Sequence, residues 1–338
     1  MSEPRELTRR DVLRITAVGG AALALGGGLT LEILRRAGLR RVTETRPRLG
    51  TLVTITAVHE DGGHARAIVR SGFAEIERLE GILSRHAANT PMSALNRDGM
   101  LAPVPDELRA VLRRARTMHD WSGGAFDPTV APLLRAYERR HERDGSLPTR
   151  EEIERALRAV GFDGVDVRDG QVRFTRPGMA LTLDGIAKGF VVDRAVAEIA
   201  ATGAERIMVD AGGDIASGGT AVRDDPWTIA VEDPDEPARS LAQLRLRGQA
   251  VATSGDYMQA FTQDRRHHHI LDPRTGRSPE HTSSVTVVTD TAMDADALST
   301  ALLVLGPEAG LAMLERVPGA EGLIVAKDGE RFASEGWA

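Results

Sequence analysis

Hydrophobic and polar residues follow two different periods along the chain. β-branched and apolar residues alternate with polar ones over Leu49–Val58, which predicts a strand. Over Ala65–Leu83 the apolar residues recur every three or four positions, which predicts a helix. The same spacing, together with prolines near first turns and a Thr149/Glu152 capping pair, predicts further helices. These are Pro105–Trp121, Pro128–Arg140, Leu147–Val160, Asp184–Ala201, Asp294–Leu305 and Pro307–Arg316.

Short β-branched runs bounded by turn residues predict the strands. They are Gly164–Val167, Gln171–Thr175, Ala180–Leu183, Ser283–Thr289, Gly322–Ala326 and several between Ile207 and Thr253, with turns at Gly212-Gly213 and Gly218-Gly219. Helices and strands mix without a regular βαβ repeat, so the predicted fold class is α+β. No internal repeat or linker divides the chain after residue 40, so residues 41–338 are predicted to form one domain.

The first 40 residues have the pattern of an export signal. Arg9-Arg10 precede an apolar run, Ile15–Leu31, that is rich in glycine, alanine and leucine. A twin arginine before such a run predicts Tat-dependent export, and therefore an extracytoplasmic location in the periplasm or on the outer face of the cytoplasmic membrane. No clear A-x-A cleavage site follows, so the alternative that the run stays as a membrane anchor remains open.

Charge and cysteine content exclude several classes of function. The formal net charge of -6 and the absence of a basic stripe argue against nucleic acid as a partner. The chain has no cysteine, which excludes disulfides, thiolate metal sites and lipid attachment to cysteine. Only Lys188 and Lys327 are lysine among 43 cationic residues, so each can mark a place that needs a compact ammonium group.

Lys188 lies in a glycine-flanked turn, Leu183–Phe190, between a predicted strand and a predicted helix. Glycines let a ligand approach the backbone, a helix N-terminus presents unpaired N–H groups, and a lysine adds charge. This combination favours a phosphate site. The turn matches neither common phosphate-loop motif, so a plain turn with a surface lysine remains an alternative.

Asp296 and Thr300 are four positions apart on a predicted helix and therefore share a face. A carboxylate and a hydroxyl, completed by carbonyl and phosphate oxygens, suit Mg²⁺. An acidic cap at the start of an amphipathic helix is the alternative interpretation. A similar ambiguity holds for Gly123–Val130, where Asp127-Pro128 is a good helix start with proline in the first position.

Three consecutive histidines, His267, His268 and His269, stand before the stretch Ile270–Gly276. Successive side chains on a strand point to opposite faces, so the three cannot all bind one ion there. The spacing therefore argues against a zinc cluster.

Eight motifs in this order resemble the ApbE family of FAD:protein FMN transferases. They are "LGT" (49–51), "LSRHAANTPMSALN" (83–96), "GGAFDPTV" (123–130), "LTLDGIAKGFVVD" (181–193), "VDAGGDIASGG" (209–219), "VATSGDY" (251–257), "HHILDPRTG" (268–276) and "DADALSTALLVLG" (294–306). They span nearly the whole chain after the signal. The resemblance implies a single mixed α/β, T-fold-like catalytic domain over residues 41–338.

The resemblance also implies the reaction and the site. Members transfer FMN from FAD to a threonine or serine hydroxyl of a carrier protein and release AMP, and the carrier would be a redox membrane complex or an exported flavoprotein. The implied Mg²⁺ ligands are Asp296, Thr300 and the carbonyls of Gly185 and Ser299. The implied FAD-contact positions are Leu49, His86, Ala125, Phe126, Asp127, Thr182, Lys188 and Ile270. Leu49 stands where methionine is common, and the aromatic residue often found near His86 is missing.

Phosphoryl transfer needs charge neutralisation at the diphosphate and a base for the attacking hydroxyl. Mg²⁺ and Lys188 can supply the first, and His269 is the candidate base, with Asp296 beside it in the catalytic set. His267 and His268 are expected to be neighbours without a proton to move, and Asp272 and Arg274 to fix the turn. The alternatives are an FAD pyrophosphatase that gives FMN and AMP, a non-enzymatic exported FAD-binding protein, and an exported redox flavoprotein.

Overall fold

The computed structural model describes residues 38–168, 170–236 and 238–337. The predicted export signal, with its twin arginine and apolar run, lies outside the described residues. Within the described part no helix is long and apolar enough to cross a bilayer. The described chain divides into two compact units, each built from two separate stretches. Unit 1 contains residues 38–76 and 192–250, and unit 2 contains residues 77–191 and 251–337.

Unit 1 contains four antiparallel strands in the order β1-β2-β6-β7 and a separate hairpin, β8–β9. The strands are β1 (Arg40–Arg48), β2 (Thr51–His59), β6 (Arg206–Ala211), β7 (Ile215–Gly218), β8 (Trp227–Glu232) and β9 (Ser240–Leu246). The β1–β2 turn consists of Leu49 and Gly50, with φ of 54° and 72°. Two positive φ values in a two-residue hairpin match the right-handed twist of the flanking strands.

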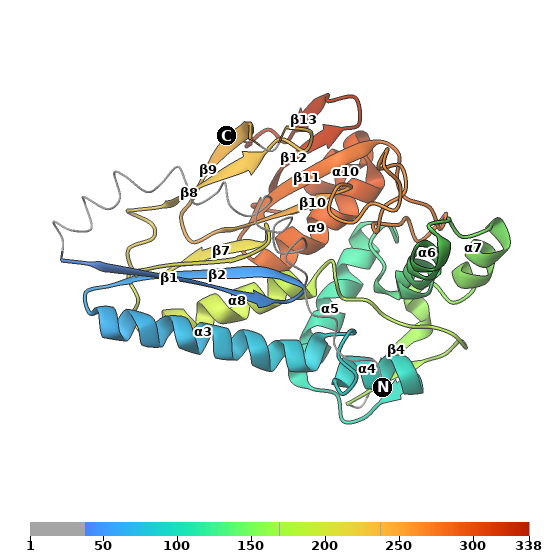
Figure 1. Ribbon diagram of the computed structural model, residues 1–338, viewed down its shortest axis with the longest axis horizontal. Helices are drawn as coiled ribbons and strands as arrows, with labels where there is room; N and C mark the ends of the chain where they lie inside the picture. The colour runs from blue at the N-terminus through green and yellow to red at the C-terminus, as the bar shows by residue number, and fades with distance from the viewer. Residues whose placement is uncertain (1–37, 169, 237, 338) are drawn as a thin grey trace. The chain divides into compact units, whose positions relative to one another are not determined.

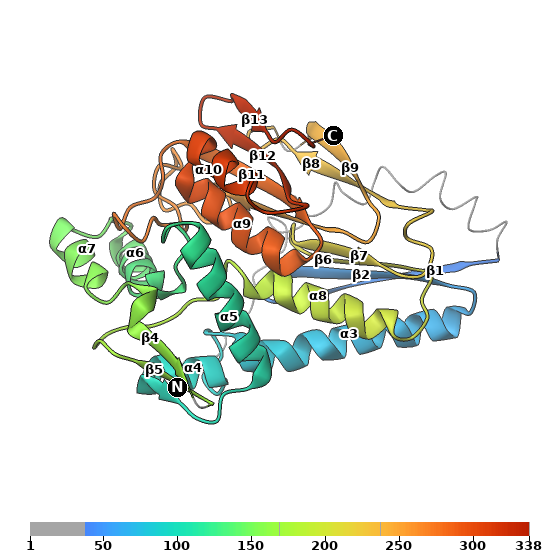
Figure 2. The ribbon, with the colours of Figure 1, turned by 180° about the vertical axis from the view of Figure 1, so that it is seen from behind.

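The first part of α3 (Gly62–Leu83) and most of α8 (Ala187–Ala200) run side by side against the strands of unit 1 (Figures 1 and 2). A Cβ added to Gly72 would lie 2.6 Å from Ile199 and 2.9 Å from Ile55. Both isoleucines are fully buried. The glycine therefore allows α3, α8 and β2 to approach closely around one apolar core.

Unit 2 contains strands in the order β10-β11-β12-β13, with α9 packed on β11 and α10 packed on α9 and β12. The bounds are β10 (Ala250–Gly255), β11 (Thr282–Thr289), β12 (Glu321–Ala326), β13 (Arg331–Ala333), α9 (Ala292–Leu305) and α10 (Pro307–Leu314). Every residue of β11 is buried, and so are most residues of α9. A helix and strand with little polar surface are typical of the centre of a domain.

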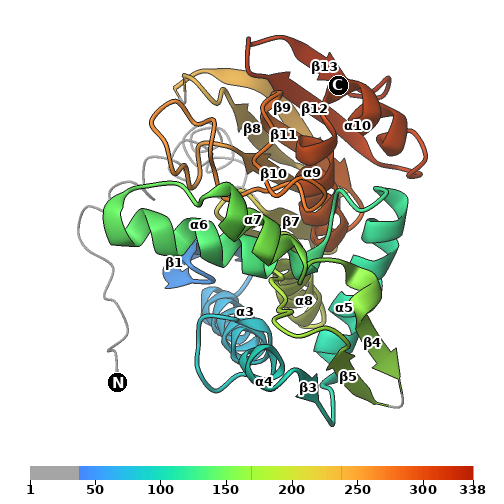
Figure 3. The same ribbon diagram turned by 90° about the vertical axis from the view of Figure 1, so that its right-hand side faces the viewer.

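The rest of unit 2 is mainly helical, with a small antiparallel sheet in the order β3-β5-β4. Its elements are α4 (Pro91–Asp98), β3 (Met100–Leu101), α5 (Asp106–Trp121), the 3₁₀ turns Pro128–Val130 and Phe162–Gly164, α6 (Ala131–Asp144), α7 (Arg150–Leu157), β4 (Val165–Arg168) and β5 (Gln171–Phe174). Helices α6 and α7 lie side by side (Figure 3), where Arg140 donates to the Glu152 carboxylate at 2.8 Å. Arg114 of α5 makes a two-point ion pair with Asp294 of α9, at 2.5 and 2.8 Å.

The α+β prediction is confirmed, and so are most of the predicted elements. The capping box at Thr149 and Glu152 is present. Ala180–Leu183 is not a strand, however, and α8 begins at Ala187 and not at Asp184. The predicted helix from Pro128 begins as a 3₁₀ turn, and α6 follows from Ala131.

Candidate functional site

The segment Ala180–Leu183 before α8 is hydrogen-bonded to a side chain and to loop backbone, and it is not part of a sheet. The side chain of Asn96 in α4 forms hydrogen bonds with both backbone polar groups of Leu181, as a neighbouring strand would. Its amide donates to the Leu181 carbonyl at 2.8 Å and accepts from the Leu181 N–H at 2.7 Å. The Thr182 N–H donates to the Pro128 carbonyl at 2.8 Å. The segment that leads to Lys188 is therefore anchored to α4 and to the 3₁₀ turn at Pro128, both in unit 2.

Helices α8 and α9 touch at their N-terminal ends. A Cβ added to Gly189 would lie 2.1 Å from the carbonyl oxygen of Ala292, so a glycine is required there. The Gly189 N–H donates to the carboxylate of Asp296 at 3.1 Å. Asp296 is only 4% exposed. This contact brings the Lys188 turn to the buried acidic residue of α9, although the two are more than a hundred positions apart in sequence.

Hydroxyl groups surround the next turn of α9. The Oγ of Ser254 at the end of β10 lies 2.8 Å from Ser299 Oγ and 3.2 Å from Thr300 Oγ1. A Cβ on Gly185 would lie 2.9 Å from Thr300 Oγ1. Gly185, Ser299 and Thr300, which the ApbE resemblance assigns to one site, therefore lie together.

This set of residues fits Mg²⁺. In the described part of the chain no three His, Cys, Asp or Glu side chains form a group that could hold a metal. The site has a single carboxylate, that of Asp296, and otherwise offers hydroxyl and carbonyl oxygens. Mg²⁺ prefers such hard donors and usually keeps part of its coordination shell for water and substrate phosphates. The absence of a side chain at Gly185 leaves room beside the Thr300 hydroxyl.

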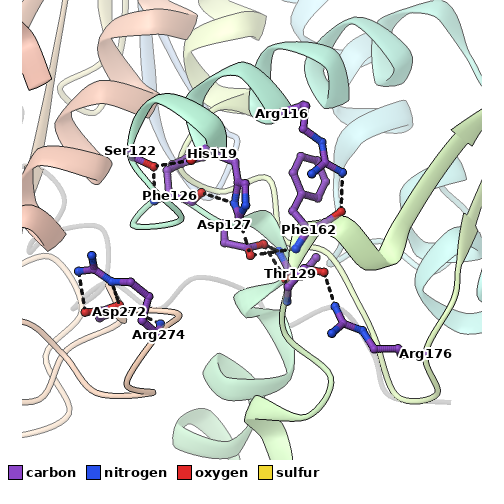
Figure 4. A network of polar contacts seen from close by, with 11 residues as sticks. Arg116, His119, Ser122, Phe126, Asp127, Thr129, Phe162, Arg176, Asp272 and Arg274 are labelled. Atoms are coloured by element: carbon purple, nitrogen blue, oxygen red, sulfur yellow. Dashed lines mark hydrogen bonds and ion pairs between the residues drawn. The ribbon is translucent and has the colours of Figure 1, made fainter.

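Asp127 is a structural centre of the loop between α5 and α6 (Figure 4). Its carboxylate accepts from the Thr129 N–H at 2.8 Å, from the Thr129 hydroxyl at 2.6 Å and from the Phe162 N–H at 3.1 Å. His119 Nδ1 lies 3.5 Å away. Burial raises the pKa of Asp127, while the hydrogen bonds and His119 act in the opposite direction. The predicted helix start at Asp127-Pro128 is therefore real, and the carboxylate is occupied in making it.

The three histidines differ in their surroundings. His268 is fully buried and its Nε2–H donates to the Pro279 carbonyl at 3.3 Å. Burial lowers the pKa of His268 to about 3. His269 is partly exposed, but its ring Nδ1 is buried, and its backbone N–H donates to the Gln259 carbonyl at 3.0 Å. Burial lowers the pKa of His269 to about 4, and the opposing charges of Asp184 and Lys188 act on the same ring.

The loop after the histidines is fixed by the residues expected to fix it. Arg274 donates to both oxygens of Asp272, at 2.8 and 2.9 Å (Figure 4). The backbone N–H of Arg274 also donates to this carboxylate. On the other side the Tyr137 hydroxyl of α6 donates to the Gly276 carbonyl at 3.1 Å.

The sequence model described as the ApbE family matches residues 49–324. The chain belongs to the ApbE family. The FAD:protein FMN transferase of Treponema pallidum is 31% identical over 323 residues, which covers 89% of each chain. The crystal structure of the ApbE protein of Thermotoga maritima superposes with a TM-score of 0.79 at 32% identity, over 88% of this chain and 97% of that one. The flavin transferase ApbE of Vibrio cholerae gives 0.77 at 29% identity, over 88% and 98%.

Most positions that the ApbE resemblance assigns to the site lie in unit 2. Ala125, Phe126, Thr182 and Ile270 are buried there. His86 is exposed, and only its backbone N–H has a contact, to Ser84 Oγ at 3.2 Å. Leu49 belongs to unit 1, in the β1–β2 turn.

Three residues of the ApbE motifs had no role predicted from sequence. Asn96 and Ser254 make the contacts described above. Arg85 donates to Asp184 at 2.9 Å and to Glu138 at 3.2 Å, and its side chain is 11% exposed. Both carboxylates raise the pKa of Arg85 against the lowering effect of burial. Each of the three stands inside a motif quoted for the resemblance, but its partners lie far away in the sequence, so the sequence carried no local signal of these contacts.

Proposed function

We propose that this protein transfers FMN from FAD to a serine or threonine hydroxyl of an acceptor protein, with Mg²⁺ as cofactor and AMP as the second product. The observation that carries the proposal is the contact between Gly189 and Asp296. It places a lysine-bearing helix start against a buried carboxylate and a hydroxyl cluster, in a chain of a family whose relatives are named FAD:protein FMN transferases.

The chemistry is one displacement at the phosphorus atom of the FMN half of FAD. The acceptor oxygen forms a bond to this phosphorus, the bridging P–O bond breaks, and AMP leaves with the bridging oxygen. Bound Mg²⁺ would neutralise negative charge on the diphosphate, held by Asp296, Thr300 and the carbonyls of Gly185 and Ser299. Lys188 would add a positive charge at the α8 N-terminus, where backbone N–H groups also favour anions.

His269 would accept the proton of the attacking hydroxyl. With a pKa of about 4 the imidazole is neutral through the physiological range, so its basic form is always present. A lower pKa also makes it a weaker base, which the Mg²⁺ and lysine charges at the phosphorus would offset. His268 cannot take this role, because its ring is buried and its Nε2–H is bound to a carbonyl.

We also propose that the protein acts outside the cytoplasm. The twin arginine and apolar run support Tat export, with the run either removed or kept as an anchor. The acceptor would then be an exported flavoprotein or an extracytoplasmic part of a redox membrane complex.

The test follows the fate of FMN. Purified protein is incubated with FAD, Mg²⁺ and candidate acceptors, and the acceptor is analysed by mass spectrometry. The expected result is an acceptor mass increased by FMN less one water, with AMP released in equal amount. Free FMN with AMP would indicate an FAD pyrophosphatase, and intact FAD would indicate a binding protein.

A further inference from the structure

The loop that joins β10 to β11 carries His269 and Ile270. It covers residues 256–281 and contains no helix or regular strand, only two isolated bridges. Connections longer than about 12–15 residues without secondary structure are uncommon in compact domains and usually functional. A base on such a loop needs something that holds the loop in one shape.

Lys327, directly after β12, contacts this loop at three points. Its ammonium group donates to the carboxylate of Asp256, the first loop residue, and to the carbonyl of Arg265 at 2.9 Å. Its backbone N–H donates to the carbonyl of His281, the last loop residue, at 3.0 Å. Lys327 therefore contacts the beginning, the middle and the end of the loop.

The carboxylate of Asp256, which binds the Lys327 ammonium group, is buried. The Asp256 side chain is 1% exposed, and the N–H of Asp256 donates to the Ser283 carbonyl at 2.9 Å. Removing the ammonium would therefore leave a buried carboxylate without its closest cation, since the Arg265 guanidinium lies at 4.0 Å. Buried charges are rarely kept without such a partner.

The middle contact involves an unusual backbone conformation. Arg265 has a φ of 56°, a left-handed value that few non-glycine residues adopt. Such conformations persist when surrounding contacts determine them, and they concentrate at functional sites. The Lys327 ammonium bound to the Arg265 carbonyl is one such contact.

We propose that Lys327 is a positioning residue for the transfer reaction, which fixes the 256–281 loop through Asp256 and Arg265 and so sets where His269 stands. This inference rests on the proposed function for the role of His269. It also accounts for the second of the two lysines in an arginine-rich chain. A compact ammonium with three rotatable donors can serve a carboxylate and a carbonyl at once, which the planar guanidinium fork does less well.

The test compares Lys327→Met with wild type in two measurements. The kcat for FMN transfer is expected to fall about 100-fold, the scale of a displaced catalytic group, while KM for FAD changes little. Amide hydrogen exchange is expected to accelerate within residues 257–269 and to stay unchanged in α5 and α6. Arg140→Met is the matched control, because the Arg140–Glu152 pair lies in the same unit with a similar side-chain exposure, 23% against 24% for Lys327. It should change neither measurement.

If Lys327→Met fails to fold, the double variant Asp256→Asn/Lys327→Met removes the unpaired carboxylate and carries the same test. Wild-type kcat together with unchanged exchange in a folded variant would overturn the inference. Hydrogen exchange needs no catalytic activity, so the two proposals can fail separately. Absence of transfer by the wild-type protein would count against the proposed function, and unchanged loop exchange would count against the role of Lys327.

Discussion

The backbone N–H of Gly189 donates to the Asp296 carboxylate across 107 positions of sequence, at a distance of 3.1 Å. One carboxylate oxygen is thus oriented by the first turn of α8. A ligand that is itself held by a hydrogen bond is pre-organised, and such support is a usual part of metal sites. Asp296 is therefore the residue on which the proposed Mg²⁺ site depends most directly.

Asp296→Ala is expected to abolish Mg²⁺-dependent AMP release, because the only carboxylate of the site is lost. FAD binding should fall only partly, since the other proposed FAD contacts remain. AMP release against Mg²⁺ concentration and FAD titration measure the two effects. Asp294→Ala is the control on the same helix, where the carboxylate pairs with Arg114. Normal turnover of Asp296→Ala with Mg²⁺ would show that the assigned ligand is wrong.

Lys188→Ala is expected to weaken FAD binding by about 1.5–3 kcal/mol, the usual contribution of a hydrogen bond to a charged group. Lys188→Arg should restore part of the affinity, because a planar fork replaces a compact ammonium imperfectly. Calorimetric titration with FAD measures both. Arg194→Ala, on the exposed side of the same helix, should bind FAD like wild type. Equal affinity in all forms would make the Lys188 turn a purely structural feature.

His269→Ala is expected to slow FMN transfer by roughly 10²–10⁴-fold, the scale of a positioned general base, with FAD and Mg²⁺ binding nearly intact. The wild-type rate should rise with pH through a pKa near 4 and not near the ordinary value of histidine, because burial keeps the ring neutral. Measuring the transfer rate against pH at saturating FAD shows this rise, which His269→Ala should lack. His267→Ala should keep both the wild-type rate and its rise with pH. An inactive His267→Ala would show that His269 is not the base.

His268 should make the protein sensitive to acid. Its pKa of about 3 lies below 6.5, the ordinary value of histidine, so between these values the unfolded chain binds more protons than the folded one. The contribution of His268 to the free energy of unfolding should therefore be fully present above pH 6.5. It should be lost progressively as the pH is lowered towards 3. His268→Gln, which keeps a donor for the Pro279 carbonyl but does not titrate, should show a shallower fall. Urea unfolding at several pH values measures it, and parallel curves would contradict the assignment.

Replacing Arg9 and Arg10 by lysine is expected to leave the protein in the cytoplasm, because the Tat pathway reads the twin arginine. Fractionation of cells that produce wild type and the double variant measures the distribution. Replacing Arg35 and Arg36, which follow the apolar run, is the control and should not prevent export. Unchanged export of the Arg9/Arg10 variant would remove the support for a Tat signal.

Local pattern predicted the helices and strands that have a clear apolar period, such as α5 and β11. It missed α4 (Pro91–Asp98), in which only Met92 and Leu95 are buried, although a threonine cap and a first-turn proline mark its start. It assigned a strand to Ala180–Leu183, a short run between turn residues. Their backbone groups are instead bound by the Asn96 side chain and the Pro128 carbonyl, partners that no local pattern can reveal.

For the site, the residue types could be predicted and their neighbours could not. The helical period places Asp296 and Thr300 on one face, and the structure keeps that relation. The approach of Gly189 to the Ala292 carbonyl depends on how two distant helices pack. The low pKa of His269 depends on the burial of a loop. Both are tertiary effects that a single sequence does not encode locally.

The division of unit 2 into two stretches has a consequence for synthesis. Residues 77–191 leave the ribosome before the whole of unit 1's second stretch, and Asp296 and Thr300 emerge only after both. A nascent chain therefore carries Lys188 for more than a hundred residues before any partner for the Gly189 N–H exists. Closing contacts this far apart is slow, because the entropy of the intervening chain is lost first. The proposed site for FAD and Mg²⁺ cannot be complete until translation has passed residue 300, so on this proposal the enzyme stays inactive throughout most of its own synthesis.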